Sequence, residues 1–190
     1  MSALPFRSTM SVEEYLALDR NSFETRYEYI DGQVYMLAGG TANHSIIKVN
    51  TISLLRTLLR GSPCHVYDSD MRVRVSETRY VYPDASVSCD SRDIGEIDIL
   101  HSPRLVVEVL SPSTEARDRR RKLGYYRACP TIQEYMLVDT HRQAVDLHRR
   151  RGNLWVLSSF GPGQQVELES LNVHFPVSAL YEDVILPEES

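Results

Sequence analysis

A carboxylate inside an apolar strand is the residue in this sequence that points most directly to chemistry. Glu108 interrupts the run Leu105–Leu110, whose other members are all leucine or valine. Such a run predicts a strand buried on both faces. An ionised carboxylate out of water costs several kcal/mol unless a cation or hydrogen-bond donors compensate it. Two explanations stay open: an ion pair with Arg72 or Arg74 on a neighbouring strand, or a metal site at the strand's carboxyl end.

A second carboxylate, Asp84, follows Pro83 within the segment Tyr80–Ser88. The aromatic and β-branched content of this segment predicts a strand, with the proline at a bulge or an edge. Pro-Asp is also a common turn dipeptide, so a turn or cap role is the alternative for Asp84. Together with Glu108, it gives two carboxylates on adjacent strands. These are the fixed oxygen ligands that Mg²⁺ accepts while it keeps waters and takes a substrate phosphate.

The bulk composition indicates one globular domain, residues 1–190, because 190 residues that are 42% hydrophobic can bury a sizeable core. No apolar run approaches the roughly 20 residues of a membrane span, and the start lacks the apolar core of a signal peptide. We therefore expect a cytoplasmic protein without a membrane partner. The net charge of −5 argues against a general nucleic-acid coat, but not against an enzyme with a basic cleft.

The cysteines Cys64, Cys89 and Cys129 are odd in number, far apart and in no Cys-x-x-Cys spacing. This pattern predicts neither a disulfide framework nor a structural zinc site. We expect all three to be buried, inert thiols.

The elements that position these residues can be read from local patterns. A capping box at Ser11–Glu14 opens a short helix that runs to about Asp19. Asp31-Gly32 predicts a hairpin turn between strands 26–30 and 33–36. Apolar residues at helical spacing predict the main core helix over 42–60.

The rest of the chain alternates between strands and one charged helix. Strands are expected at 66–68, 71–75, 80–88, 104–110, 134–139, 144–149 and 154–160, with a helix at 114–128. This order predicts an α/β or α+β fold, a mixed sheet with helices on its faces. The crossover through the charged helix predicts that the strands before and after it are parallel.

Asp84, the strand with Glu108 and the helix with Lys122 resemble the core of the restriction-endonuclease-like fold, whose signature is written PD-(D/E)XK. More narrowly, the chain resembles the Uma-two (Uma2) family of candidate nucleases of that fold. The shared motifs are Tyr27-Glu28-Tyr29-Ile30-Asp31-Gly32, His44 at the start of the first long helix, Tyr82-Pro83-Asp84, Leu105 to Thr114, Asp118 to Lys122 with Tyr125-Tyr126, and Glu134 to Asp139. Glu-Val-Leu-Ser-Pro-Ser-Thr, residues 108–114, is the most specific of them.

This resemblance implies a metal-dependent endonuclease that hydrolyses phosphodiester bonds of nucleic acid, with DNA the expected substrate. Asp84 and Glu108 would hold Mg²⁺ or Mn²⁺, with Glu28 as a further acid. The signature lysine lies two residues beyond the acid, where this chain has Leu110. The resemblance implies that Lys122 supplies the ammonium group from the next helix.

Each of these roles has a plainer alternative. Asp118 and Lys122 are spaced i, i+4 and could form a surface pair. Glu28 could lie on the exposed face of the hairpin, and His44 could be a surface group near the helix start rather than a phosphate contact.

A cluster of arginines on the charged helix could grip backbone phosphates, or it could be a solvated helix face. Its members are Arg117, Arg119, Arg120 and Arg121. A homodimer would suit the cutting of two strands. The alternative function is a catalytically inactive nuclease fold that binds nucleic acid or a protein partner, with Leu110 marking the lost lysine. A serine or cysteine hydrolase is disfavoured, because the chain has no Gly-x-Ser-x-Gly pattern.

Overall fold

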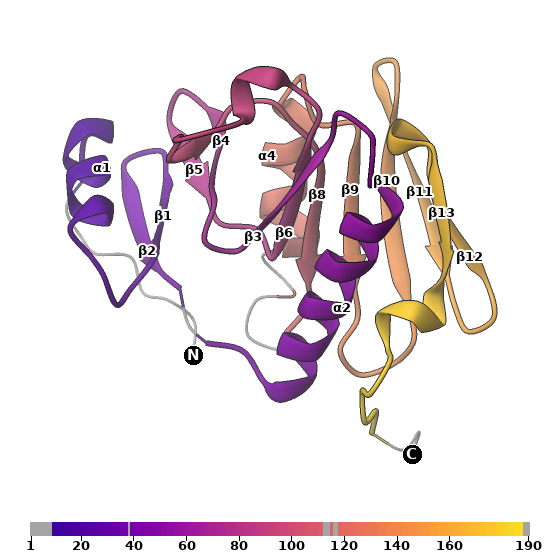
Figure 1. The fold of residues 1–190 in the computed structure, drawn as a ribbon. Coiled ribbons are helices and arrows are strands. Elements are labelled where there is room, and N and C mark those ends of the chain that lie inside the picture. Colours follow the sequence, from indigo (N-terminus) through magenta and orange to yellow (C-terminus); the bar gives the residue numbers. More distant parts are fainter. Residues whose placement is uncertain (1–8, 38, 112–114, 116–117, 188–190) are drawn as a thin grey trace.

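A computed structural model describes residues 9–37, 39–111, 115 and 118–187 (Figure 1). Its helices are α1 (Val12–Arg20), α2 (Ala42–Leu58) and α4 (Leu123–Ala128), and a π-helical segment, Asp118–Lys122, leads directly into α4. Its strands are β1 (Tyr27–Ile30), β2 (Gln33–Met36), β3 (His65–Asp68), β4 (Arg72–Ser76), β5 (Arg79–Val81), β6 (Ala85–Ser88), β7 (Ile99–Leu100), β8 (Pro103–Val109), β9 (Glu134–Val138), β10 (Val145–Arg151), β11 (Leu154–Phe160), β12 (Gln165–Leu168) and β13 (Val173–Pro176). Among the described residues, no helix has the length and apolar character that a bilayer span requires.

The strands form two main sheets and a C-terminal hairpin. One sheet has the order β2-β1-β5-β4-β7, the other has the order β11-β10-β9-β8-β6-β3, and β12 pairs with β13. Strands β8 and β9 are parallel, while β9–β10 and β6–β8 are antiparallel. The α+β class, the mixed sheet and the parallel crossover past α4 are therefore as predicted.

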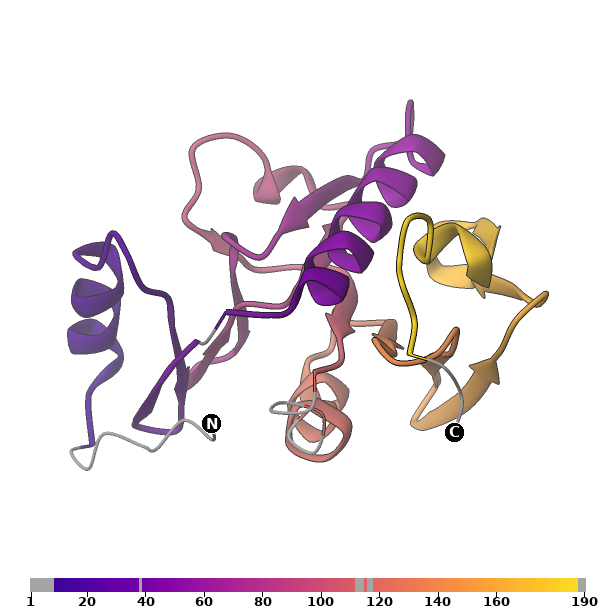
Figure 2. The same ribbon diagram turned by 90° about the horizontal axis from the view of Figure 1, so that it is seen from below.

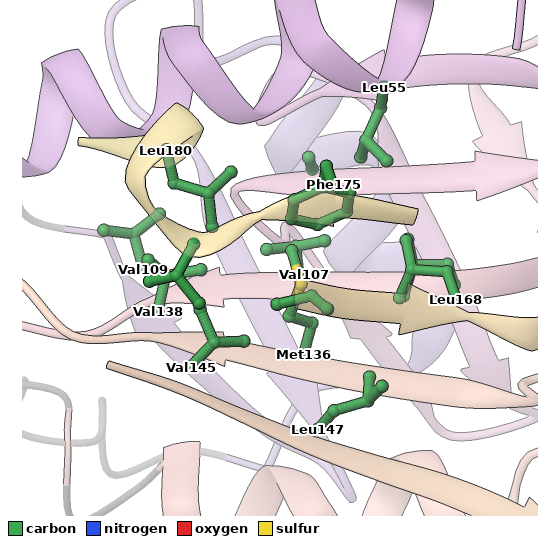
Figure 3. Packing of buried hydrophobic residues seen from close by; sticks show 14 of the residues in the cluster. Leu55, Val107, Val109, Met136, Val138, Val145, Leu147, Leu168, Phe175 and Leu180 are labelled. Atoms are coloured by element: carbon green, nitrogen blue, oxygen red, sulfur yellow. The ribbon is translucent and has the colours of Figure 1, made fainter. Parts of the chain in front are cut away.

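The six-stranded sheet is covered on both faces, which Figure 2 shows as α2 and α4 on opposite sides of it. On one face, Val107 of β8 and Met136 of β9 pack with Leu55 of α2 and with Phe175 and Leu180 from the C-terminal segment (Figure 3). A second cluster on the other face contains Val106 of β8 together with residues of α4 and β9. Because side chains alternate along a strand, Glu108 must point to this second, α4 side.

Local sequence signals explain the N-terminal elements that carry Glu28. The capping box is confirmed: the Glu14 amide donates to Ser11 Oγ over 3.2 Å, and the Ser11 amide donates to Glu14 Oε2 over 2.7 Å. The hairpin turn is also as predicted, with positive φ at Asp31 (49°) and Gly32 (90°). Tyr15 of α1 stacks on Tyr29 of β1 with ring centroids 5.0 Å apart, which anchors this strand.

The segment predicted as one strand, residues 80–88, is two strands in different sheets. Strand β5 ends at Val81 in the five-stranded sheet, and β6 begins at Ala85 in the six-stranded sheet. Pro83 lies between them and has no N–H for a ladder hydrogen bond. The chain therefore crosses from sheet to sheet at Pro83-Asp84.

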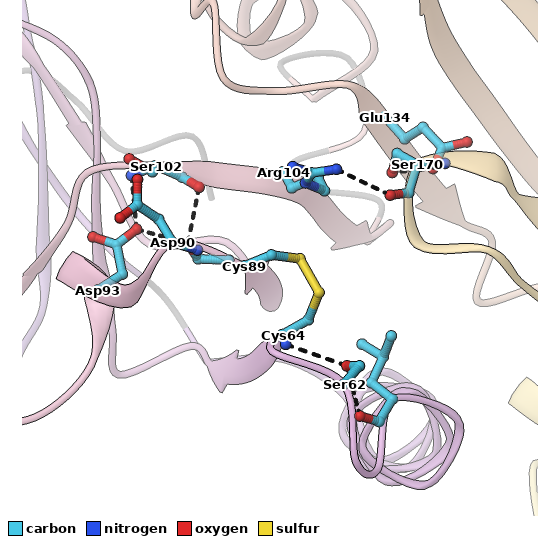
Figure 4. The surroundings of a disulfide bond; sticks show 11 residues. Ser62, Cys64, Cys89, Asp90, Asp93, Ser102, Arg104, Glu134 and Ser170 are labelled. Carbon is cyan, nitrogen blue, oxygen red and sulfur yellow. Dashed lines mark hydrogen bonds between the residues drawn. A yellow bond between two sulfur atoms is a disulfide. The ribbon is translucent and has the colours of Figure 1, made fainter.

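The cysteine prediction was wrong for two of the three residues. Cys64 and Cys89 form a disulfide (Figure 4), and both are half-buried rather than buried. Strands β3 and β6 are antiparallel with His65 opposite Ser88, so the next residues outward, Cys64 and Cys89, face each other. The sequence separation of 25 gave no sign of this pairing. Cys129 is a buried free thiol, as predicted.

The disulfide should stabilise the fold measurably. Replacing both cysteines with Cys64→Ser and Cys89→Ser should lower the free energy of unfolding by about 2–4 kcal/mol, because the cross-link restricts the unfolded chain. Urea unfolding with and without dithiothreitol measures this. The parent should lose stability in reductant and the double variant should not. Equal stability of the oxidised and reduced parent would contradict the prediction.

Candidate active site

Asp84 and Glu108 lie opposite each other where the two sheets meet. Strands β6 and β8 pair antiparallel with Ala85 opposite Val107, so one step further places Asp84 opposite Glu108. The Val109 amide donates to Asp84 Oδ2 over 2.8 Å, which fixes the aspartate at the end of β8. The two predicted metal ligands are thus brought together by the register of one strand pair.

Lys122 reaches this pair from the π-helical segment. Its Nζ lies 2.8 Å from Glu108 Oε1, 3.1 Å from Glu28 Oε1 and 3.4 Å from Asp118 Oδ1. The surface-pair alternative is wrong, because Asp118 and Lys122 are only 1% and 4% exposed. The ammonium group of Lys122 is therefore enclosed by three carboxylates.

Glu28 is completely buried, so its placement on an exposed hairpin face is also wrong. Strand β1 lies between β2 and β5, and its successive residues Glu28 and Tyr29, which point to opposite faces, are both buried. Tyr29 packs on α1, while Glu28 points the other way and contacts Lys122. The Tyr82 amide donates to Glu28 Oε1 over 3.4 Å, which connects this acid to the crossing segment.

The arginine partners proposed for Glu108 are used elsewhere. Arg72 binds Asp19 at 2.8 Å and donates to the Tyr82 hydroxyl, and Arg74 pairs with Glu77. Strand β4, which carries both arginines, belongs to the five-stranded sheet and is not adjacent to β8. The ion-pair alternative with these arginines was therefore wrong, and Lys122 pairs with Glu108 in their place.

Tyr126 is a site residue to which sequence reasoning gave no role. Its hydroxyl donates to Glu108 Oε1 over 2.7 Å, on the same oxygen that Lys122 contacts. The available signal was its spacing, since residues four apart, like Lys122 and Tyr126, lie on one face of a helix. Burial and the charge of Glu108 hold the pKa of Tyr126 well above its usual range, so the phenol stays a hydrogen-bond donor.

The residues expected to contact nucleic acid differ in where they lie and in whether acids already pair with them. His44 lies at the site, with Nε2 3.3 Å from Asp84 Oδ2. Arg119 instead pairs with Glu115 at 2.8 Å and Asp146 at 2.5 Å. Arg120 and Arg121 are exposed, and Arg121 lines a small cavity beside Glu28 and Lys122. Arg117 and the 112–114 part of the most specific motif lie outside the described residues.

Among the described residues, the site holds more acidic than basic side chains. Burial raises the pKa of Glu108 to about 8; Lys122 opposes this shift, and the charges of Asp118 and Asp84 add to it. One ammonium group faces the carboxyls of Glu28, Glu108 and Asp118, and Asp84 adds a fourth acid next to them. A divalent cation would reduce this imbalance, and hard carboxylate oxygens suit Mg²⁺ or Mn²⁺.

The described residues contain no cluster of three or more acidic, histidine or cysteine side chains arranged to hold a metal ion. Asp84 and Glu108 can supply two ligands. That number fits Mg²⁺, which is commonly bound through one or two carboxylates and retains several waters.

Comparison with known proteins gives the family. Residues 12–178 match the family model Uma2, described as "Putative restriction endonuclease". The chain belongs to the Uma2 family. An uncharacterized Synechocystis protein, slr1290, is 38% identical over 90% of this chain and 91% of its own length. A second, sll1609, is 31% identical over 84% of this chain and 92% of its own length.

One solved structure shares the fold of this Uma2 chain. It is described as a putative nuclease belonging to DUF820, from Anabaena variabilis. The match has a TM-score of 0.77 and covers 93% of this chain and 99% of the other, at 21% identity. The nuclease-like fold expected from the resemblance is thus confirmed.

Glu108→Gln in the Uma2 chain should change how stability depends on pH. The folded protein holds a proton on Glu108 more tightly than the unfolded chain, because its pKa rises from 4.5 to about 8. The parent should therefore lose stability as pH rises from about 4.5 to about 8, and the variant should lose less.

Urea unfolding in metal-free buffer between pH 5 and pH 9 measures the effect. The stability of the variant relative to the parent should increase with pH by a few kcal/mol at most, since one pKa unit corresponds to about 1.4 kcal/mol. A constant loss of stability at every pH would instead indicate that Glu108 is an ionised structural partner of Lys122.

Proposed function

We propose that this chain is a metal-dependent endonuclease that hydrolyses phosphodiester bonds, with DNA as substrate. The observation that carries the proposal is the 2.8 Å contact between Lys122 Nζ and Glu108, opposite Asp84. It reproduces in space the two acids and one lysine of the PD-(D/E)XK signature, although the signature position holds Leu110. Membership of the Uma2 family supports the same reaction class.

Asp84 and Glu108 would hold Mg²⁺ or Mn²⁺. When bound, such an ion lowers the pKa of a coordinated water and offsets charge on the phosphate oxygens. Lys122 would orient the attacking water or stabilise the charge that develops on the phosphate.

Glu28 and Asp118 would keep the ammonium of Lys122 charged and in place. A lysine that is 4% exposed would tend to lose its proton without such partners, because burial disfavours the charged form. Glu28 is thus proposed to act on the catalytic lysine rather than as a direct metal ligand.

Contacts to the nucleic-acid backbone are assigned to Arg120 and Arg121, because both are exposed and Arg121 lies beside the site. Arg119 is already engaged by two acids, so we give it no such role. His44 lies next to Asp84, so we assign it a contact with the phosphate that is cleaved and not with the flanking backbone. The homodimer and the cytoplasmic location stay predictions from the sequence. The Cys64–Cys89 disulfide argues against the cytoplasmic location, because disulfides are uncommon in a reducing cytoplasm.

A plasmid-cleavage assay tests the proposal. The purified chain should cut DNA in Mg²⁺ or Mn²⁺ and should not cut it in excess EDTA. Asp84→Asn should abolish cleavage. Asp98→Asn, at an exposed acid paired with Arg20, should leave it unchanged. Cleavage that persists in EDTA would contradict metal dependence, whereas DNA binding without cleavage in any metal would favour the inactive-binder alternative.

Lys122→Met should separate chemistry from binding. A group that stabilises transition-state charge affects kcat more than ground-state affinity, so kcat should fall by about 100-fold or more. DNA affinity should change little, and it would be measured beside kcat at saturating Mg²⁺, with circular dichroism to verify folding.

The matched control is Lys48→Met, which replaces the only other lysine of the chain, on α2, where it contacts Ser69. That variant should keep the parent rate. A folded Lys122→Met protein with the full cleavage rate would remove Lys122 from the mechanism.

A further inference from the structure

Two donors converge on one oxygen of Glu108. Lys122 Nζ lies 2.8 Å from Oε1, and the Tyr126 hydroxyl lies 2.7 Å from it. Within the described residues, every hydrogen bond and ion pair of the Glu108 side chain falls on this oxygen. Two donors on one oxygen restrict the rotation of the carboxyl group, and so they also restrict where Oε2 points.

The position of the Tyr126 hydroxyl is set by the core. Its side chain is fully buried, and its ring lies against Tyr135 of β9 with centroids 4.7 Å apart. Tyr126 follows Lys122 by four residues, so the same turn of the chain delivers both donors. A hydroxyl held in this way can restrict Glu108 without moving itself.

Asp84 is held in a similar way, by other residues. Its Oδ2 accepts from the Val109 amide over 2.8 Å and lies 3.3 Å from His44 Nε2. Each of the two opposed acids is thus tied through one oxygen. Outer hydrogen bonds of this kind orient metal ligands in proteins, and their loss typically lowers metal affinity or activity by about 10–100-fold.

We propose that Tyr126 is a positioning residue of the metal site: its hydroxyl holds Glu108 Oε1, so that Oε2 is the oxygen presented to the ion. This inference rests on the proposed function, in which Asp84 and Glu108 share a divalent cation. Tyr126 itself touches neither the ion nor the substrate. One-oxygen coordination suits Mg²⁺ and Mn²⁺ sites that keep several waters.

The test is Tyr126→Phe, which removes the hydroxyl and keeps the ring. Calorimetric titration of the full chain with Mn²⁺, without DNA, should show an affinity about 10–100-fold below that of the parent. The matched control is Tyr15→Phe, another fully buried tyrosine, whose hydroxyl donates to a backbone carbonyl at Tyr27. This control should bind Mn²⁺ like the parent.

A double-variant cycle distinguishes positioning from a general structural role. Glu108→Asp keeps a carboxylate but withdraws it from the hydroxyl by one methylene. If Tyr126 acts through Glu108, Tyr126→Phe should have little further effect on Mn²⁺ affinity in the Glu108→Asp background. Independent, additive losses in the two variants would overturn the inference.

The two proposals fail in different ways. A parent chain that binds no Mn²⁺ overturns both the proposed function and this inference. A parent that binds Mn²⁺ and cuts DNA, beside a Tyr126→Phe variant with equal affinity and lower stability only, overturns the inference and leaves the nuclease function standing.

Discussion

The buried ammonium group of Lys122 is the interaction on which the rest of the site depends. It contacts Glu28 of the five-stranded sheet, Glu108 of the six-stranded sheet and Asp118 of the π-helical segment. Without it, these three buried acids would lose the cation that they share, at a cost of several kcal/mol. The same charge that would serve the chemistry therefore joins the two sheets. The chain has 19 arginines and two lysines, and one of the two lysines takes this buried position.

The crossing between the sheets gives the site its second constraint. Because the chain changes sheet at Pro83-Asp84, Asp84 can face Glu108 across the β6–β8 ladder while Tyr82 contacts Glu28. A slip of one residue in that ladder would turn Glu108 into the apolar cluster beneath α2. The hydrophobic pattern of β8 therefore sets the direction of the acid, in addition to filling the core.

Local patterns predicted what local interactions determine. The capping box, the hairpin turn, the apolar run around Glu108 and the parallel crossover follow from residue types and spacing. The partners of buried groups did not, because each depends on contacts between distant segments. Arg72 and Arg74 were reasonable partners for Glu108 until β4 proved to lie in the other sheet. The burial of Glu28 and the disulfide at Cys64 depend, in the same way, on which strands become neighbours.

The position of the signature lysine explains how this chain departs from the PD-(D/E)XK pattern. Leu110 continues the sheet, since its amide donates to the Val138 carbonyl over 2.8 Å, and its side chain packs in the apolar cluster on the α4 side. A lysine there would have to bury its stem within that cluster. In this chain the ammonium group belongs to Lys122 of the π-helical segment. Asp118 contacts it, and Tyr126 donates to the same Glu108 oxygen. The two acids and the lysine lie together in space although the lysine stands elsewhere in the sequence, so a motif search along β8 alone would miss Lys122, which we propose as the lysine of the site.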